Sequence, residues 1–367
     1  MHFIIFLLVT SIQTWNIAGN YYSDCTYENT YNLPDEYTAS GILAFGDSML
    51  DTGNNLYIPL TPLKSNFWPY GIDFTVTYPS GRFSNGKMLP DLLARYLGAC
   101  ALSDIILPYL SPNIQPLNLL DGLSFASAGA GYDILTSTLK SSISLEDQIK
   151  NLKDFNVKLS KTYGNLSKES FYIKAMAFVS AGTEDIINYF PSSSRSVQYD
   201  INAYTDLLAQ TSFNFVKNLI DQGVRRIGVF GVPPIGCFPL YRSPGLCDET
   251  LNKAALLLNS KLSHKLADLG AESQLNSTQI VFMNIYEDYM RLIQNGTKYG
   301  FDIVTKACCG IGNSDTKYLC NKINPSLGDM KGLSYLFYDG HHLTEKGYSI
   351  LALFNFAKYM DKFTKPY

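Results

Sequence analysis

The sequence predicts an α/β fold in which helices cover both faces of a mainly parallel sheet. An unbroken apolar run with the length of a buried strand lies at residues 42–45, and further buried-strand candidates, largely apolar, follow at residues 175–180, 226–230 and 279–283. Stretches with apolar residues at helical spacing lie between and after these runs, at residues 88–97, 199–222, 248–269, 286–294 and 344–362. Strands that alternate with helices favour a parallel sheet between two helical layers.

The composition describes one globular domain with a sizeable core. Of 367 residues, 46% are hydrophobic and 17% are charged, which excludes a disordered chain. No internal repeat or linker divides the sequence, so we expect a single domain over residues 20–367. The net charge of -3 offers no basic surface for nucleic acid.

Residues 1–19 resemble a secretory signal peptide. An apolar run at residues 3–9 precedes the small residues Ala18 and Gly19, which offer a cleavage point. The run is too short to span a bilayer, which needs about 20 residues. Glycosylation sequons at Asn165, Asn276 and Asn295 also favour export.

Seven cysteines predict disulfides in an oxidising compartment, with at least one cysteine left over. We expect Cys237 to pair with Cys247 across a short loop, and Cys320 to pair with Cys308 or Cys309. Adjacent cysteines do not match the Cys-x-x-Cys spacing of zinc sites, so no metal is predicted.

The first strand leads directly to a candidate nucleophile. Gly46 ends the apolar run, and Asp47 and Ser48 follow it. Ligands bind at the carboxyl ends of strands in open α/β sheets, so Ser48 would lie at the mouth of a site. Alternatively, Asp47 or Ser48 simply caps the next helix.

Irregular segments come next in the chain. Residues 57–78 are rich in Pro, Gly and aromatics and read as a long loop, whose aromatic part from 67 to 78 hints at a groove for a flat or apolar group. Residues 121–132 are rich in Gly, Ala and Ser; their amides could bind an anion, or they form a plain turn. Residues 305–332 read as an irregular loop.

A candidate base precedes the last predicted helix, for which Thr344 is the expected cap. Asp339 and His342 are three positions apart and share a face of a helical turn. The carboxylate can therefore hold the imidazole while its other nitrogen takes a proton from Ser48, which is the logic of a catalytic triad. Alternatively, His341 and His342 are a solvated or metal-binding pair.

These blocks together resemble a plant GDSL esterase/lipase of the SGNH hydrolase superfamily. The matching segments are residues 45–55, 125–133, 231–237, 307–310 and 339–345. The resemblance implies a flavodoxin-like, three-layer α/β/α sandwich with Ser48 as nucleophile, His342 as base and Asp339 as its orienter. It also implies a small-molecule or lipid ester substrate, no cofactor, no stable membrane insertion and a monomer.

One position departs from the family where it matters. The third family block reads Gly-x-Asn-Asp, and its Asn donates a hydrogen bond to the oxyanion, but Glu184 stands here instead. An ionised carboxylate has no proton to donate, and losing one oxyanion donor costs roughly 10²–10³-fold in rate. The remaining expected donors are the backbone amides of Ser48 and Gly129, the latter chosen over Gly131. Leu343 replaces a usual Pro, which we expect to be tolerated.

Four consequences of Glu184 remain open. In the first, burial keeps the carboxyl neutral so that it donates a hydrogen bond. In the second, the site transfers acyl groups to an acceptor other than water. In the third, hydrolysis is lost, and in the fourth, Glu184 points away from the site.

Taken together, these features of the sequence predict a secreted serine esterase/lipase of the extracellular space, apoplast or vacuole. The alternatives are an acyltransferase of specialised metabolism and a catalytically weak binding or defence-associated protein.

Overall fold

A computed structural model describes residues 39–74, 80–98, 105–190, 193–243, 245–272, 278–309, 320 and 333–363. The expected signal peptide at residues 1–19 and the sequon at Asn276 lie outside the described residues.

The central sheet has four parallel strands in the order β1-β2-β3-β4, namely β1 (Ile42–Gly46), β2 (Met176–Ser180), β3 (Arg226–Phe230) and β4 (Gln279–Met283). Each strand lies within one residue of its predicted run. The first three strands are buried along their whole length. Helices on both faces exclude water from such a sheet, which is why these strands read as continuous apolar runs rather than alternating ones.

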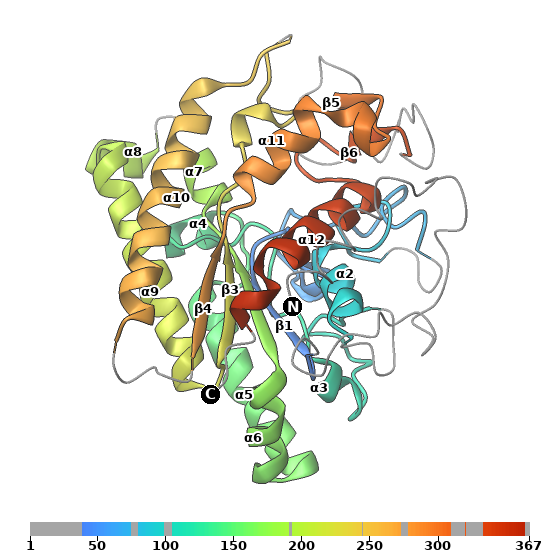
Figure 1. The fold of residues 1–367 in the computed structure, drawn as a ribbon, viewed down its shortest axis with the longest axis vertical. Coiled ribbons are helices and arrows are strands. Elements are labelled where there is room, and N and C mark those ends of the chain that lie inside the picture. Colours follow the sequence, from blue (N-terminus) through green and yellow to red (C-terminus); the bar gives the residue numbers. More distant parts are fainter. Residues whose placement is uncertain are drawn as a thin grey trace.

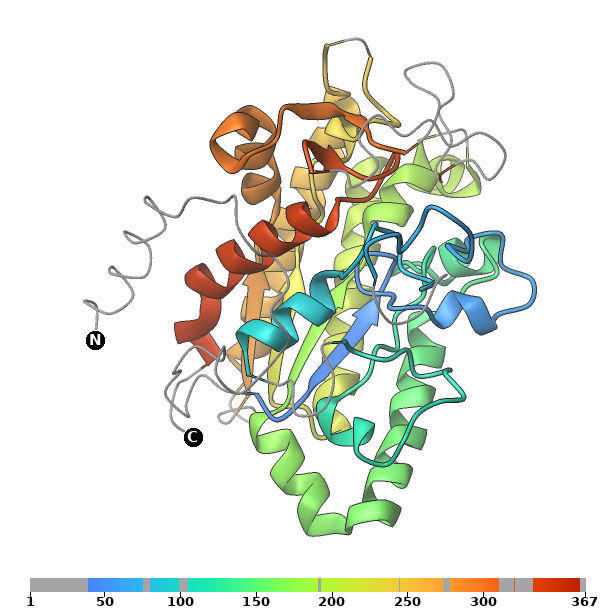
Figure 2. The same ribbon diagram turned by 90° about the vertical axis from the view of Figure 1, so that its right-hand side faces the viewer.

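The strand order reverses at β1. On the edge of β1 that faces away from β2, Ala44 donates to the Leu123 carbonyl over 3.1 Å and accepts from the Phe125 amide over 2.7 Å. The chain therefore passes from β1 to one side of the sheet and returns to β2 on the other. In open α/β sheets, ligands bind outside the carboxyl ends of the strands at such a reversal, and the arrowhead of β1 points toward this end of the sheet in Figure 2.

Two helical layers enclose the sheet. In Figure 1, α9 (Ile201–Asp221) and α10 (Glu249–Gly270) lie on its left, and α2 (Leu89–Tyr96) and α12 (Glu345–Tyr359) lie on its right. The α/β/α sandwich that we predicted is confirmed. A side chain caps the first turn of several helices: Asp200 accepts from Ala203, Asp248 from Thr250, and Thr344 from Gly347, as expected.

Several elements escaped the sequence analysis. They are α3 (Asn118–Asp121), α4 (Ile134–Leu139), α5 (Leu145–Tyr163), α6 (Asn165–Lys174), α7 (Thr183–Tyr189) and α8 (Ser194–Gln198). The expected helix α11 (Tyr286–Gln294) is present. Among the described residues, no helix is both long and apolar enough to cross a membrane.

A second, two-stranded parallel sheet pairs β5 (Ile303–Ala307) with β6 (Tyr335–Phe337). The prediction of an irregular loop from residue 305 is wrong for residues 305–307, because a half-exposed strand on a small sheet shows no apolar run. Residues 310–319 and 321–332 of that segment lie outside the described part of the chain. This small sheet matters for the site because β6 leads directly into Asp339.

Both expected disulfides are present. Cys237 pairs with Cys247, and Cys320 pairs with Cys309 rather than with Cys308. The second bridge ties the end of β5 to Cys320, close to the turn that follows β6.

Candidate active site

Ser48 follows the end of β1, where β1 lies beside the end of the parallel strand β2. The Gly46 backbone has a positive φ of 113°, and a Cβ there would lie 1.8 Å from the Ser180 carbonyl oxygen, so only glycine allows this approach. The Asp47 amide then donates to the same carbonyl over 2.8 Å. The local sequence thus fixes Ser48 to two strands at once.

Asp339 and His342 form a closed turn between β6 and α12. The Oδ1 atom of Asp339 accepts from the backbone amides of His341 and His342 over 2.8 and 2.7 Å. The Nδ1 atom of His342 lies 2.9 Å from both carboxylate oxygens, so the predicted local contact is present. The Asp339 carboxylate is thus bonded to both the backbone and the ring of His342, and these contacts fix the orientation of the imidazole.

The turn and the end of β1 meet across 294 positions of sequence. The Nε2 atom of His342 lies 2.8 Å from the Ser48 hydroxyl. Asp339, His342 and Ser48 are all buried. The three candidate side chains stand in one hydrogen-bonded row, an arrangement that is able to deprotonate a serine for attack on a carbonyl carbon.

The side chains after Ser48 support the segment that follows residue 123. Asn54 donates through Nδ2 to the carbonyls of Ser124 and Ala126, each over 2.8 Å. Asp51 accepts from the Ala128 amide over 3.0 Å, and Asn55 donates to the Ala128 carbonyl over 3.0 Å. These buried bonds explain why the block at residues 51–55 occurs together with the block at residues 125–133.

A turn before α2 holds the start of α12. The Ser84 hydroxyl donates to the Leu343 carbonyl over 3.0 Å, and Asn85 Oδ1 accepts from the Glu345 amide over 2.8 Å. Glu345 in turn accepts from the Lys87 amide over 3.0 Å. The Phe83 ring lies against the His342 imidazole, with centroids 5.0 Å apart. The turn at residues 81–86 therefore packs against the candidate base His342 and is hydrogen-bonded to the residues that follow it.

Gly129 and Ser48 present backbone amides that make no hydrogen bond within the described part of the chain. Gly129 has a positive φ of 86°. The amide of Gly131, the alternative donor, also makes no hydrogen bond within the described part of the chain. Gly131 packs against the Asp185 carboxylate, which accepts from the Tyr132 amide over 2.7 Å. Asp185 thus fixes the end of the glycine-rich segment.

Glu184 lies in the first turn of α7 and is buried. Its Oε1 atom is 3.8 Å from the Nε2 atom of His341, and the His341 ring lies 5.0 Å from that of His342. Glu184 is therefore enclosed by the protein and lies beside His341, and all four of its consequences stay open. The Glu184 carboxyl group thus contacts His341, and the His341 ring separates it from the candidate base His342.

Burial dominates the electrostatics here. It lowers the pKa of His341 well below the usual value, with help from the neighbouring His342 and Lys140, so His341 is neutral. Burial, together with the negative charge of Glu184, raises the pKa of Asp47 to about 8. Groups around Ser48 therefore carry less charge than their side-chain types suggest.

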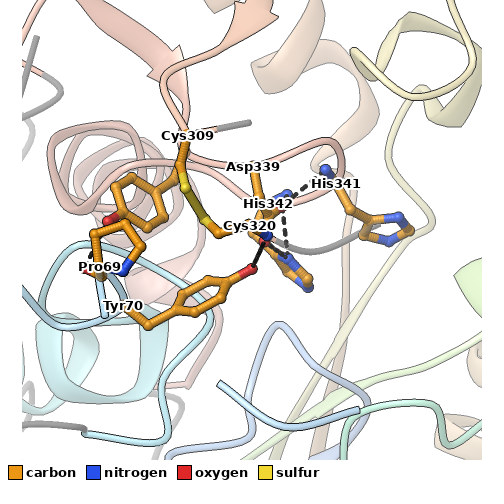
Figure 3. Close-up of a disulfide and its surroundings, with 8 residues drawn as sticks. Pro69, Tyr70, Cys309, Cys320, Asp339, His341 and His342 are labelled. Atoms are coloured by element: carbon orange, nitrogen blue, oxygen red, sulfur yellow. Dashed lines mark hydrogen bonds and ion pairs between the residues drawn. A yellow bond between two sulfur atoms is a disulfide. The ribbon is translucent and has the colours of Figure 1, made fainter. Parts of the chain in front are cut away.

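Two buried side chains of the site were not found by sequence reasoning. Tyr70 donates to Oδ2 of Asp339 over 2.6 Å (Figure 3). Gln148, on α5, donates to the Gly46 carbonyl over 3.0 Å and accepts from the Gly46 amide over 2.7 Å. Neither belongs to a local pattern that points to Asp339 or Gly46, because both partners are distant in sequence.

The other predicted site residues lie at the surface. Asn165 and Asn295 are exposed, as glycosylation requires. Within the described ranges, no group of three or more His, Cys, Asp and Glu side chains could hold a metal ion.

Comparison with known proteins places the chain among ester hydrolases. A family model described as GDSL-like Lipase/Acylhydrolase matches residues 42–354, from β1 into α12. The GDSL esterase/lipase EXL3 of Arabidopsis thaliana is 38% identical over 337 residues, which cover 90% of each chain. The GDSL esterase/lipase At1g20120 of the same plant is 40% identical over 333 residues, covering 89% of this chain and 80% of its own.

Proposed function

The chain belongs to the GDSL family of lipases and acylhydrolases and is a carboxylic ester hydrolase, and we propose that it is a secreted serine esterase that works through an acyl-enzyme on Ser48. The observation that supports this mechanism best is the 2.8 Å contact between the Ser48 hydroxyl and His342 Nε2.

In the proposed reaction, the Ser48 oxygen attacks the ester carbonyl while His342 takes the hydroxyl proton through Nε2. The resulting tetrahedral intermediate collapses, the C–O bond to the alcohol breaks, and His342 returns the proton to the leaving oxygen. Water then attacks the acyl-serine in the same way and releases the acid. Asp339 holds the ring and stabilises its charged form through Nδ1.

For the oxyanion we propose the backbone amides of Ser48 and Gly129 as donors. Their lack of partners within the described residues supports this role, because donors already aimed at the developing charge need no rearrangement. Glu184 stands where a third donor is expected. With two donors in place of three, the oxyanion is stabilised less, and the activation barrier is higher than in a site with three donors.

Acyl transfer to an alcohol is a second candidate function, and the burial of Glu184 beside His341 favours it. A carboxylate in this place can accept a hydrogen bond from the hydroxyl of an acceptor. Such an acceptor would replace water in the second half of the reaction and leave as the new ester.

We also propose export and a monomeric state. Two disulfides support an oxidising compartment such as the extracellular space or the vacuole. The exposed sequons at Asn165 and Asn295 agree with passage through the secretory route.

A fluorophosphonate probe tests the mechanism, because it reacts only with an activated serine. We expect stoichiometric labelling of Ser48 in the native chain, none in Ser48→Ala and strongly slowed labelling in His342→Ala. His264→Ala removes an exposed histidine of α10 and serves as the matched control with native labelling. Labelling that survives in both Ser48→Ala and His342→Ala would reject the proposed nucleophile and base.

A further inference from the structure

Tyr70 reaches the candidate catalytic carboxylate from a distant loop. Its hydroxyl donates to Asp339 Oδ2 over 2.6 Å, across 269 positions of sequence, and the whole side chain is buried. Figure 3 shows the phenol aimed at Asp339 from the side opposite His341. A bond this short to a carboxylate belongs to the stronger class of hydrogen bonds.

The two oxygens of Asp339 have different supports. Oδ1 is fixed by the amides of His341 and His342. Oδ2 shares the contact with His342 Nδ1, and within the described part of the chain it accepts in addition from the Tyr70 hydroxyl. Tyr70 therefore sets the tilt of the carboxylate plane and competes with the imidazole for its negative charge.

Tyr70 is itself rigidly placed. Its ring packs edge-on against those of Phe67, Phe83 and Tyr338, with centroids 5.3, 6.0 and 5.7 Å away. Its oxygen accepts from the Cys320 amide over 3.0 Å, and the disulfide to Cys309 holds Cys320. The oxygen thus accepts from Cys320 while its proton is donated to the carboxylate, which can only accept.

A second tyrosine braces the same loop from the opposite direction. The Tyr338 hydroxyl donates to the Pro69 carbonyl over 2.6 Å and is also buried. Tyr338 thus resembles Tyr70 in burial, bond length and position, yet its hydroxyl does not touch Asp339. This pair separates the effect of packing from the effect of the bond to the carboxylate.

We propose that Tyr70 is a positioning residue for the reaction, acting through Asp339 on the basicity and orientation of His342. The proposal rests on the proposed function of Ser48, His342 and Asp339. Burial and the Asp339 charge raise the pKa of Tyr70 well above the usual value, so the phenol stays a donor at every pH at which the enzyme is assayed.

The test is the pH profile of kcat/KM for p-nitrophenyl acetate in Tyr70→Phe and Tyr338→Phe. Tyr70→Phe should lower kcat roughly 10- to 100-fold with KM little changed, the factor expected for one hydrogen bond to a charged group. Without the phenol, more of the carboxylate charge faces the imidazolium, so the acidic limb should move to higher pH. Tyr338→Phe should keep the native acidic limb.

Each outcome decides between the bond and the packing. A native kcat and acidic limb in Tyr70→Phe, or the same displaced limb in both variants, would overturn the proposal. Ser48→Ala, measured alongside, separates the two proposals: if it retains turnover, the proposed function itself fails. If it is inactive while Tyr70→Phe behaves as native, only the role of Tyr70 is lost.

Discussion

The protonation of Asp47 makes stability depend on pH in an unusual direction. Burial raises its pKa from 3.8 to about 8, and the nearby charge of Glu184 adds to the effect. In the unfolded chain the same group ionises near its ordinary value. Between these two values the folded protein holds one proton more at Asp47, so the contribution of this group to stability is fully present below pH 3.8 and is lost as the pH rises through about 8.

One extra proton in the folded state changes the free energy of unfolding by about 1.4 kcal/mol per pH unit. From pH 5 to pH 7, Asp47 alone should therefore lower it by about 2.7 kcal/mol. Asp47→Asn keeps an acceptor oxygen for the Met49 amide and the Ser180 hydroxyl but cannot ionise. The variant should lose this part of the pH dependence. Between pH 5 and pH 7, its free energy of unfolding should therefore fall by about 2.7 kcal/mol less than that of the native chain.

Urea unfolding at pH 5, 6 and 7 with the disulfides intact measures the slope directly. Asp154→Asn is the matched control, because Lys158 lowers the pKa of this exposed carboxyl and it is ionised in both states over that range. Equal slopes in the native chain and Asp47→Asn would refute the reasoning, as would an equal loss of slope in the control.

Two further substitutions test the neighbourhood of the site. Glu184→Asn supplies an amide donor and removes a negative charge. The kcat for p-nitrophenyl acetate should therefore rise at least about tenfold, toward the roughly 10²–10³-fold effect of one oxyanion donor. An unchanged or lower kcat would show that Glu184 does not impair the oxyanion hole. Gly86→Ala places a Cβ 1.8 Å from Glu345 Oε2. The Glu345 carboxyl must then swing away and lose its bond from the Lys87 amide, which should cost about 1–3 kcal/mol of stability in urea unfolding. Gly270→Ala, where no atom lies within 4 Å, is its control, and equal losses in both would contradict the steric argument.

The strands of the central sheet were predictable because of where they lie. A parallel strand covered on both faces is largely apolar, so β1 to β3 stand out from their surroundings. Alternate residues of β4 are half-buried, yet its last four residues still form an apolar run. Half-exposed β5 carries Thr305 and Lys306 and has no such signature. Helix α5 had a readable signal, since the Ser144 cap and apolar spacing mark its start, whereas α7 has two turns and too few positions to show a period.

In the candidate site too, contacts between residues close in sequence could be predicted, whereas contacts between distant residues could not be read from a local pattern. Asp339 and His342 are three residues apart, so their contact follows from spacing. The meeting of Ser48 with His342 rested on chemistry and family resemblance, because no local pattern encodes a contact across 294 positions. Tyr70 was hidden for this reason, and the aromatic loop at residues 67–78 suggested only a groove.

The amide of Asn54 also closes the flank of the central sheet. Beyond β1, the next strand-like segment offers its outward carbonyls at Ser124 and Ala126, and Asn54 occupies both. The Tyr109 amide takes the Ser124 carbonyl as well. The backbone of residues 107–109 also pairs with this edge, because Ser124 donates to the Leu107 carbonyl over 2.9 Å and Pro108 lies opposite Ser124. Open edges invite a strand from another molecule, but here such a strand would have to displace both this segment and Asn54, a side chain six positions after Ser48.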